Sequence, residues 1–437
     1  MDAPDDRAVQ PGPSDFAAGP ARVYGEVQSV TGVAMLRQLL VALAVAGSTL
    51  VAGPGSARAV DGPLSAAQLN HRLHGEVMGY LPYWEMNDAT VASLDYSRLT
   101  TIAFFSVGFD AAGHLDRTGR GYAALMSDRA TGVIDAAHAS GVRAIVSFSS
   151  FGSGRNDAFF SDAGAQATFV DEAAALVAAR GLDGADLDVE LISGGSIGAY
   201  AATAGALSTR IRASNAIAFT TVATNANVSG AKMAASALAA GVAYAFLMGY
   251  DYRSADSTLV GSIAPLVRAG GGLSLSASLD VYAAEQVPLG RVILGLPLYG
   301  RTWQTADEGP APERLAGTSG EVFFFRDLAT LEGQGTVVAM DTDGIESSAR
   351  LVRDVEGVIY QTYYDTPASI APKLQLAADR GLAGIGFWAL GYDRDPAYWE
   401  VVEATFGTPA AAADATAPDA GAAPDALDGL GGPHQPR

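Results

Sequence analysis

Short apolar runs recur along the chain, and most of them are followed by a segment with apolar residues at helical spacing. Runs of this length and composition are typical of buried β-strands. We predict strands over residues 75–84, 99–109, 142–151, 181–190, 217–224, 242–252, 292–303 and 382–390. Helices are expected between them, for example over residues 165–179 and 197–211. Alternating strands and helices form parallel β/α units, and eight such units close naturally into a barrel.

The predicted fold is therefore an α/β fold, a (β/α)8 TIM barrel. The near-continuous apolar character of most strands supports it, because a parallel sheet is covered on both faces. An open doubly wound sheet is the alternative, but no glycine-rich phosphate loop follows the first strand. The interval over residues 304–366 is too long for a simple connection and contains the strand-like runs VVAMDT and GVIYQTYYDT. We predict a small β-containing insertion there, between strands seven and eight.

The two ends of the chain differ from this central region. Met35 to Ala59 has the basic start, short apolar run and Ala-Arg-Ala ending of a signal peptide. A bilayer span needs about 20 apolar residues, so we expect cleavage after Ala59 and secretion without a stable membrane anchor. Residues 1–34 are predicted to be a disordered extension, or to be untranslated if synthesis starts at Met35. Residues 408–437 predict a disordered low-complexity tail, which leaves residues 60–407 for the barrel domain.

Composition excludes several classes of partner. Lys and Arg total 27 against 47 Asp and Glu, giving a formal net charge of −20. Such a field repels phosphate backbones, so nucleic acid is not an expected partner. The chain has no cysteine, and of its five histidines only His71 and His74 are close in sequence. We therefore expect no metal site and no other cofactor, and a monomer.

The segment GLDGADLDVE, residues 181–190, places four carboxylates in an otherwise apolar pattern. Because side chains alternate between the two faces of a strand, Asp186, Asp188 and Glu190 share one face. The aliphatic residues between them suit the surrounding helices, which places the three acids inside the barrel. Asp183 falls outside this series and is expected to shape the start of the strand.

Three buried carboxylates, each roughly 7 Å from the next, cannot all ionise freely. We expect at least one shared proton, with apparent pKa values that belong to the group. A carboxylic acid kept protonated near neutral pH can act as a general acid. Glu190 is best placed to reach a substrate, because active sites of such barrels lie at the C-terminal ends of the strands. Pairing of the acids with buried cations is disfavoured, since the segment offers only Arg180 just before the strand.

Four segments together resemble the motifs of the family 18 glycoside hydrolases, the chitinase-like (β/α)8 enzymes. DGADLDVE, residues 183–190, fits the DGxDxDxE signature at every specified position. MGYDY (248–252) resembles the sixth-strand Met-x-Tyr-Asp motif, and GLPLYGRTW (295–303) resembles the seventh-strand Gly-x-Pro-x-Tyr-Gly-Arg segment. GIGFWALGYD (384–393) is similar to the eighth-strand tryptophan motif. The matches run in the family order, from residue 75 to about residue 395.

Two departures from the family pattern affect the expected shape of the substrate subsites. The third-strand Ser-x-Gly-Gly pattern is SFSS here, residues 147–150, which keeps the serine and loses both glycines. The Trp-Glu-Tyr often found around the catalytic acid is Val189-Glu190-Leu191. Neither departure removes a catalytic group.

The resemblance implies retaining hydrolysis in which the substrate's own 2-acetamido group is the nucleophile, an exception to the two-carboxylate scheme. Glu190 would protonate the glycosidic oxygen and then activate water. Asp188 would accept the acetamido N–H, Asp186 would share a proton with it, and Tyr250 would donate to the acetamido carbonyl. By the same resemblance the substrate-binding residues are Tyr80, Met248, Asp251, Tyr299, Arg301 and Trp388.

The expected function is a secreted glycoside hydrolase that cleaves β-1,4 bonds next to N-acetylglucosamine in an oligo- or polysaccharide. The same chemistry on peptidoglycan or N-glycans is an alternative, because Trp is missing beside Glu190 and no segment resembles a chitin-binding module. A non-catalytic, lectin-like carbohydrate-binding protein is a further alternative. Such relatives typically lack the catalytic Glu or its Asp partner, whereas this chain retains Asp186, Asp188, Glu190 and Tyr250.

Overall fold

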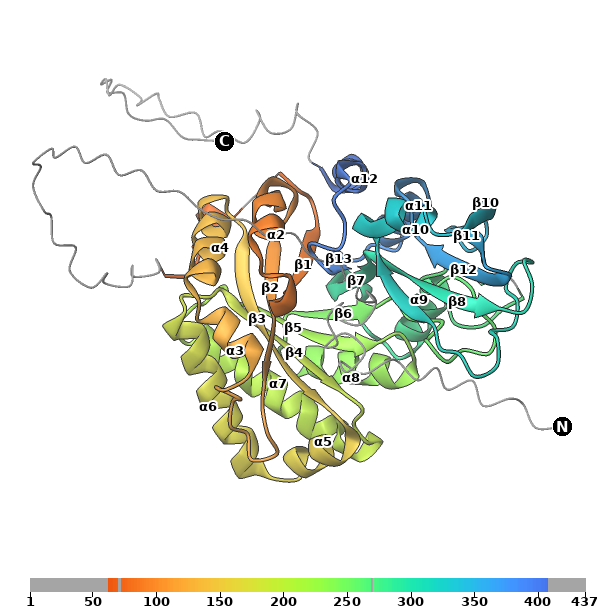
Figure 1. The fold of residues 1–437 in the computed structure, drawn as a ribbon. Helices are drawn as coiled ribbons and strands as arrows, with labels where there is room; N and C mark the ends of the chain where they lie inside the picture. The colour runs from red at the N-terminus through yellow and green to blue at the C-terminus, as the bar shows by residue number, and fades with distance from the viewer. Residues whose placement is uncertain (1–61, 70–71, 269, 408–437) are drawn as a thin grey trace, which may run out of the picture.

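The computed structural model describes residues 62–69, 72–268 and 270–407. The predicted extension, signal peptide and tail lie outside these residues. Eight parallel strands close into a barrel in the order β1-β13-β7-β6-β5-β4-β3-β2, which confirms the predicted TIM barrel (Figure 1). The barrel strands are β1 (Glu76–Pro82), β2 (Thr101–Gly108), β3 (Arg143–Phe151), β4 (Gly184–Glu190), β5 (Phe219–Asn225), β6 (Tyr244–Met248), β7 (Val292–Pro297) and β13 (Gly384–Trp388).

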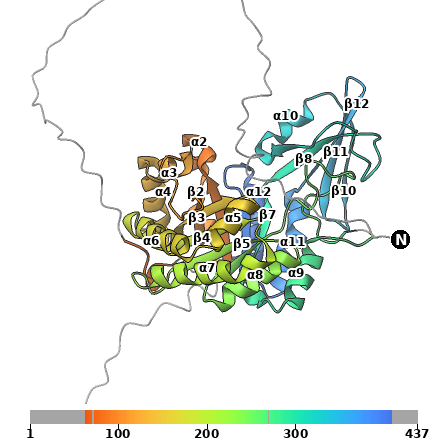
Figure 2. The ribbon, with the colours of Figure 1, turned by 90° about the horizontal axis from the view of Figure 1, so that it is seen from below.

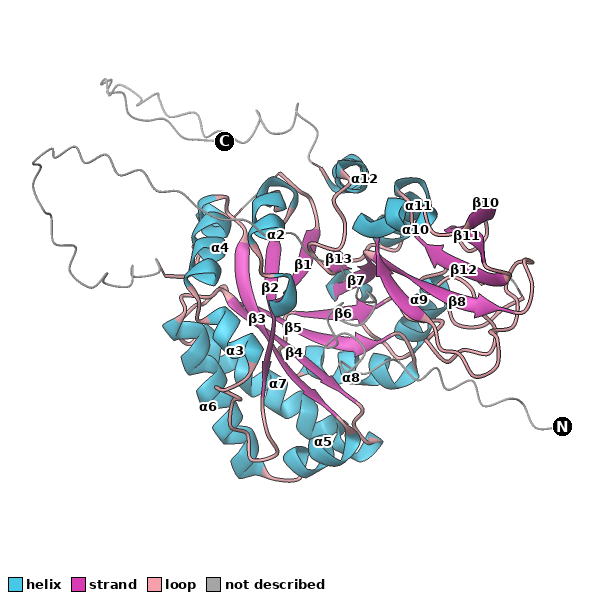
Figure 3. Ribbon diagram, viewed as in Figure 1, coloured by secondary structure: helices cyan, strands magenta, loops and turns pink. Residues whose placement is uncertain are grey.

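Helices surround the barrel strands (Figure 3). They are α2 (Asp88–Ser93), α3 (Arg120–Leu125), α4 (Asp128–Ala139), α5 (Ser153–Phe160), α6 (Ala163–Ala179), α7 (Ile197–Arg212), α8 (Val228–Ala239), α9 (Leu275–Ala284), α10 (Leu328–Glu332), α11 (Pro367–Asp379) and α12 (Pro396–Phe406). Short 3-10 turns are η1 (Ala66–Gln68), η2 (Tyr83–Glu85), η3 (Tyr96–Arg98), η4 (Gly194–Ser196), η5 (Leu289–Arg291) and η6 (Phe325–Asp327). Within the described part of the chain, no helix has the length and apolar character to cross a bilayer.

A five-stranded antiparallel sheet stands to one side of the barrel (Figure 2). Its strands come between β7 and α11 in the sequence. In the order of the sheet its strands are β10 (Thr336–Asp343), β11 (Ser348–Val355), β12 (Val358–Tyr364), β8 (Tyr299–Thr305) and β9 (Glu321–Phe324). This sheet is the predicted insertion between the seventh and eighth barrel strands.

The insertion begins earlier than predicted, because the expected seventh strand, residues 292–303, is two strands. The barrel strand β7 ends at Pro297, which lacks the backbone N–H that a continuing ladder would need. After Leu298 the chain joins the other sheet, where Tyr299 pairs with Phe324 of β9. Arg301 pairs in the same sheet with Tyr363 of β12. The sequence motif around Tyr299 and Arg301 therefore belongs to the insertion and not to the barrel wall.

The sixth strand also ends earlier than predicted. β6 stops at Met248, whereas the apolar run predicts a strand to residue 252. Asp251 has φ of 55°, in the left-handed region that a strand cannot contain. Tyr250 and Asp251 therefore lie on the loop that follows β6, at the C-terminal end of the barrel.

Asp183, just before β4, fastens the N-terminal segment to the barrel. Its buried carboxylate accepts the backbone N–H of Leu64 at 2.6 Å and that of Ala144 at 2.7 Å. The Nε2 atom of His138, at the end of α4, lies 2.9 Å from Oδ2, the oxygen that also accepts from Ala144. The structure thus gives Asp183 the structural role that its place outside the row of three acids predicts.

The Asp183→Ala substitution should lower the free energy of unfolding by roughly 2–4 kcal/mol, because two buried N–H groups lose their acceptor. Urea unfolding measured side by side with Asp171→Ala provides the comparison. Asp171 forms an exposed ion pair on α6, so its loss should cost less than about 1 kcal/mol. Equal stability of the two variants would contradict the assigned role of Asp183.

Candidate active site

Asp186 lies in the interior of the barrel, where three hydroxyl groups donate to its carboxylate. Tyr80 of β1 donates at 3.1 Å, Ser147 of β3 at 2.8 Å and Thr221 of β5 at 2.6 Å. β1 is not a neighbour of either β3 or β5 in the barrel, so its side chain can meet theirs only across the interior. The prediction that this face of β4 points into the barrel is therefore confirmed.

Asp186 receives its hydrogen bonds from hydroxyl groups, and the expected proton shared with Asp188 stays a prediction. Burial raises the pKa of Asp186, and the three hydroxyl donors oppose that rise. Asp188 is buried beside it, and its Oδ1 atom has no hydrogen-bond partner among the described residues. Burial raises the pKa of Asp188 well above its ordinary value, and the charges of Glu190 and Asp186 raise it further. Hydroxyl groups, not a neighbouring acid, thus satisfy Asp186, and Asp188 keeps an oxygen available.

Glu190 ends β4 and is the only one of the three acids that is partly exposed. Burial raises the pKa of Glu190 to about 7. A hydrogen bond from the Asn225 side chain lowers this pKa, and the negative charge of Asp251 raises it. A carboxyl group that titrates near neutral pH can both give and take a proton, which is the property that general acid and base catalysis requires.

Tyr250 and Asp251 approach the acids from the loop after β6. Burial raises the pKa of Tyr250 well above its ordinary value, followed by the charge of Asp188, so its hydroxyl stays protonated and able to donate. The Asp251 carboxylate accepts from Nη2 of Arg301 at 3.0 Å, and the ring of Tyr299 lies 6.3 Å from that of Tyr250. Tyr299 and Arg301 are almost completely buried, at 0% and 1% exposure.

The predicted contact of Tyr299 and Arg301 with a substrate stays a prediction, and in this structure both side chains pack behind the loop that carries Asp251. Both side chains come from β8 of the insertion and stand behind Asp251. Burial, followed by the negative charge of Asp251, raises the pKa of Tyr299 well above its ordinary value. They therefore hold the loop after β6 against the insertion and do not form the exposed surface of the site.

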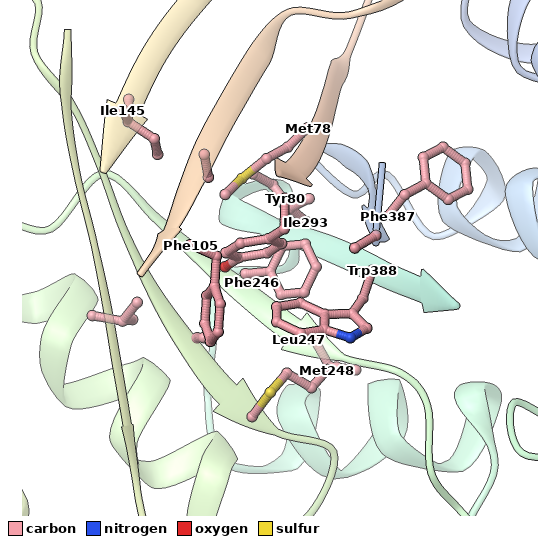
Figure 4. Close-up of a cluster of buried hydrophobic side chains, with 14 of the residues drawn as sticks. Met78, Tyr80, Phe105, Ile145, Phe246, Leu247, Met248, Ile293, Phe387 and Trp388 are labelled. Atoms are coloured by element: carbon pink, nitrogen blue, oxygen red, sulfur yellow. The ribbon is translucent and has the colours of Figure 1, made fainter. Parts of the chain in front are cut away.

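Trp388, at the end of β13, closes the opposite side of the site with other aromatic rings. Its ring packs edge-on against Phe105 of β2 at 4.5 Å between centroids and lies 5.4 Å from Tyr80. Figure 4 shows these rings together with Phe246, and Met248 near the edge of Trp388. The barrel therefore brings the predicted Tyr80, Met248 and Trp388 into one cluster.

Sequence reasoning missed two residues of this site, Phe105 and Asn225. Phe105 occurs in a uniformly apolar run, which gives no sign of which ring will face Trp388. Asn225 lies one residue beyond the predicted fifth strand, yet β5 extends to it. The pairing of β4 with β5 would have identified Asn225, but strand register is not readable from a single sequence.

The described residues contain no group of three or more His, Cys, Asp or Glu side chains placed to hold a metal ion. The carboxyl groups of the site can transfer protons, and hydroxyl donors and an aromatic surface lie beside them. Burial and mutual repulsion tune the acids, and Glu190 is the one that solvent reaches.

The sequence model of glycosyl hydrolases family 18 matches residues 76–393. The chain therefore belongs to this family, a family of glycoside hydrolases. The match covers all eight barrel strands from β1 to β13 and the insertion between them.

Curated relatives include chitinases from plants and animals. The chain is 29% identical over 160 residues to the class V chitinase CHIT5 of Lotus japonicus, covering 34% of this chain and 37% of that protein. It is also 29% identical over 164 residues to the probable chitinase 2 of Drosophila melanogaster, covering 34% of each. The chain thus matches little more than a third of the length of these relatives.

Solved structures share the fold over a larger part of the chain. A mutant chitinase from Cycas revoluta in complex with (GlcNAc)4 superposes with a TM-score of 0.67 at 21% identity, covering 76% of this chain and 99% of that one. A chitinase-like agglutinin from Robinia pseudoacacia superposes with a TM-score of 0.64, also at 21% identity and with the same coverage. The shared fold thus occurs in chitinases and in an agglutinin.

The Glu190 carboxyl should titrate near pH 7 in the protein without substrate, because burial raises its pKa to about 7. Carbon-13 NMR of protein labelled at glutamate side chains measures this titration, and the signal lost in Glu190→Gln identifies Glu190. A titration below pH 5, as for an exposed glutamate, would contradict the described environment.

Proposed function

We propose that the protein hydrolyses β-1,4 bonds next to N-acetylglucosamine, with retention of configuration and with the substrate's acetamido group as nucleophile. The observation that carries the proposal is the Oδ1 of Asp188, which has no hydrogen-bond partner within residues 62–69, 72–268 and 270–407, next to a Glu190 whose pKa is about 7. An acetamido N–H supplies the donor that this oxygen lacks. A protonated Glu190, next along the strand, supplies the proton that a departing glycosidic oxygen needs.

Each step of the proposed reaction uses one of these groups. Glu190 protonates the glycosidic oxygen while the acetamido oxygen attacks the anomeric carbon, which gives an oxazolinium ion and releases the leaving sugar. Asp188 accepts the acetamido N–H, and the positive charge that develops on the substrate favours the ionised form of Asp188. Tyr250 donates its hydroxyl to the acetamido carbonyl oxygen. Glu190, now ionised, takes a proton from water as the water oxygen attacks the anomeric carbon. The oxazolinium ring opens, and the anomeric carbon regains its original configuration.

Trp388 provides the apolar surface on which the reacting sugar packs. The C–H face of a pyranose is apolar and suits an aromatic ring. Phe105 and Tyr80 fix the orientation of the indole from two sides. Asp186 remains inside the barrel, held by its three hydroxyl donors. Its charge raises the pKa of Asp188.

A chitin-type oligosaccharide is the substrate that we favour. The Cycas revoluta chitinase structure that shares this fold is a complex with (GlcNAc)4. The Val189 departure gives no argument against chitin, because Val189 is buried and strand alternation turns it to the face opposite the acids. Leu191, directly after Glu190, is 61% exposed. Leu191 is therefore the departure from the family pattern that faces solvent. The sequence of Met35 to Ala59 supports export of the enzyme to such a substrate.

A lectin-like function is the second candidate, because an agglutinin shares the fold. Retention of Asp188, Glu190 and Tyr250 in one buried cluster supports turnover instead. Binding alone gives no reason to keep a carboxyl group with a pKa near 7 between two other acids.

The Glu190→Gln substitution should lower the rate of hydrolysis of an N-acetylglucosamine oligomer by about 10²–10⁴-fold, since it removes one general acid and preserves its shape. Release of shorter oligomers, followed by chromatography, measures the rate. Glu400→Gln, at an exposed position on α12, is the matched control and should keep full activity. Unchanged hydrolysis by Glu190→Gln would remove Glu190 from the mechanism.

A fully deacetylated oligomer should not be cleaved at a measurable rate, because it lacks the acetamido oxygen that acts as nucleophile. Product analysis on acetylated and deacetylated oligomers of the same length compares the two. Peptidoglycan and a high-mannose glycopeptide, assayed in parallel, separate the alternative substrates. Efficient cleavage of the deacetylated oligomer would contradict the substrate-assisted mechanism.

A further inference from the structure

Asn225 stands at the same level as Glu190 on the adjacent strand. β4 and β5 run parallel, and their pairing ends with Asp188 opposite Ala223. The same register continued by two residues brings Glu190 level with Asn225, the last residues of the two strands. Thr221 of β5 reaches Asp186 inside the barrel, and side chains alternate along a strand. Asn225 therefore faces the interior, on the same side as the three acids.

Glu190 is held from two directions by asparagines. The side chain of Asn225 hydrogen-bonds to the Glu190 carboxyl group. Nδ2 of Asn156, on α5, donates to the backbone carbonyl of Glu190 at 2.5 Å. Asn156 is itself fixed, because its Oδ1 accepts from the Ser150 hydroxyl at 2.7 Å. The main chain and the carboxyl group of Glu190 thus have separate anchors.

Hydroxyl groups of α9 hold the end of β5 that carries Asn225. The Tyr282 hydroxyl donates to the backbone carbonyl of Asn225 at 2.8 Å and lies 2.8 Å from the Thr224 hydroxyl. The Ser278 hydroxyl donates to the next carbonyl, that of Ala226, at 2.8 Å. The consecutive carbonyls of Asn225 and Ala226, at the end of β5, are thereby fixed to α9. This limits the positions that the Asn225 side-chain amide can occupy.

We propose that Asn225 is a positioning residue, which donates its side-chain amide to Glu190 and so fixes the carboxyl group and favours its ionised form. The proposal rests on the proposed role of Glu190 as acid and base. An amide that stabilises the carboxylate prepares Glu190 for the second half of the reaction, in which it must accept a proton from water. It also keeps the carboxyl group in one orientation while the proton is transferred.

The other groups facing Glu190 act in the opposite sense or stay neutral. Asp251, on the loop after β6, carries a negative charge that favours the protonated form of Glu190. Asp188, on the same strand, is held toward its own protonated form by burial and by the charge of Glu190. Tyr250 keeps its proton. On the β3 side Glu190 is paired with Phe151, which carries no charge. Asn225 is therefore the hydrogen-bond donor that limits the rise in the pKa of Glu190.

Two substitutions test this role. Asn225→Ala removes the donor, so the pKa of Glu190 should rise and the alkaline limb of kcat/KM should move to higher pH. Asn225→Asp keeps the shape but adds a negative charge, so the limb should move further in the same direction. We expect kcat for each variant to fall by about 10- to 100-fold, the effect of losing one hydrogen bond to a charged group. Asn227→Ala, which removes the cap of α8 two residues away, should leave the limb in place.

The carbon-13 NMR titration of Glu190 in the substrate-free variants provides a reading that does not depend on the substrate. A higher pKa in Asn225→Ala than in wild type and in Asn227→Ala supports the proposal. An unchanged pKa, with or without a lower kcat, would overturn it and leave Asn225 a purely structural residue. Absence of hydrolysis by the wild-type protein would instead count against the proposed function, and the titration would still decide the role of Asn225.

Discussion

Three carboxyl groups share one inward face of β4, and the other residues of the site are arranged to accommodate them. An isolated acid inside a barrel is costly, and three in a row are costlier still. The structure reduces that cost differently at each position. Asp186 receives hydroxyl donors from β1, β3 and β5, Asp188 is held toward its protonated form by burial and by its neighbours, and Glu190 reaches solvent. Closure of the barrel is what brings these donors together.

The insertion sheet takes part in the same arrangement. Arg301 and Tyr299 lie on β8 of the insertion, which begins after β7 ends at Pro297. They hold Asp251 in place beside Glu190. The charge of Asp251 raises the pKa of Glu190, and Asn225 from β5 lowers it. The protonation of Glu190 thus depends on both the barrel and the insertion.

Much of this could be predicted from the sequence, for reasons that are local. The alternation of acids with aliphatic residues from Asp186 to Glu190 is enough to orient β4, and recurring apolar runs are enough to indicate the barrel. The break after Pro297 was hidden by a continuous apolar run that serves two sheets. Asn225 and Phe105 were missed because their role depends on which residue lies beside them across strands, and no single run of sequence contains that information. The family motifs located Tyr250 and Trp388, but not the burial of Arg301.

The configuration of the first product distinguishes attack by the substrate's acetamido group from direct attack by water. Proton NMR spectra recorded within minutes of mixing enzyme and an N-acetylglucosamine oligomer show the anomer formed before mutarotation. The account predicts the β-anomer, because attack by the acetamido oxygen followed by attack of water inverts the anomeric carbon twice. First appearance of the α-anomer would mean that water attacks directly, and would contradict the roles assigned to Asp188 and Glu190.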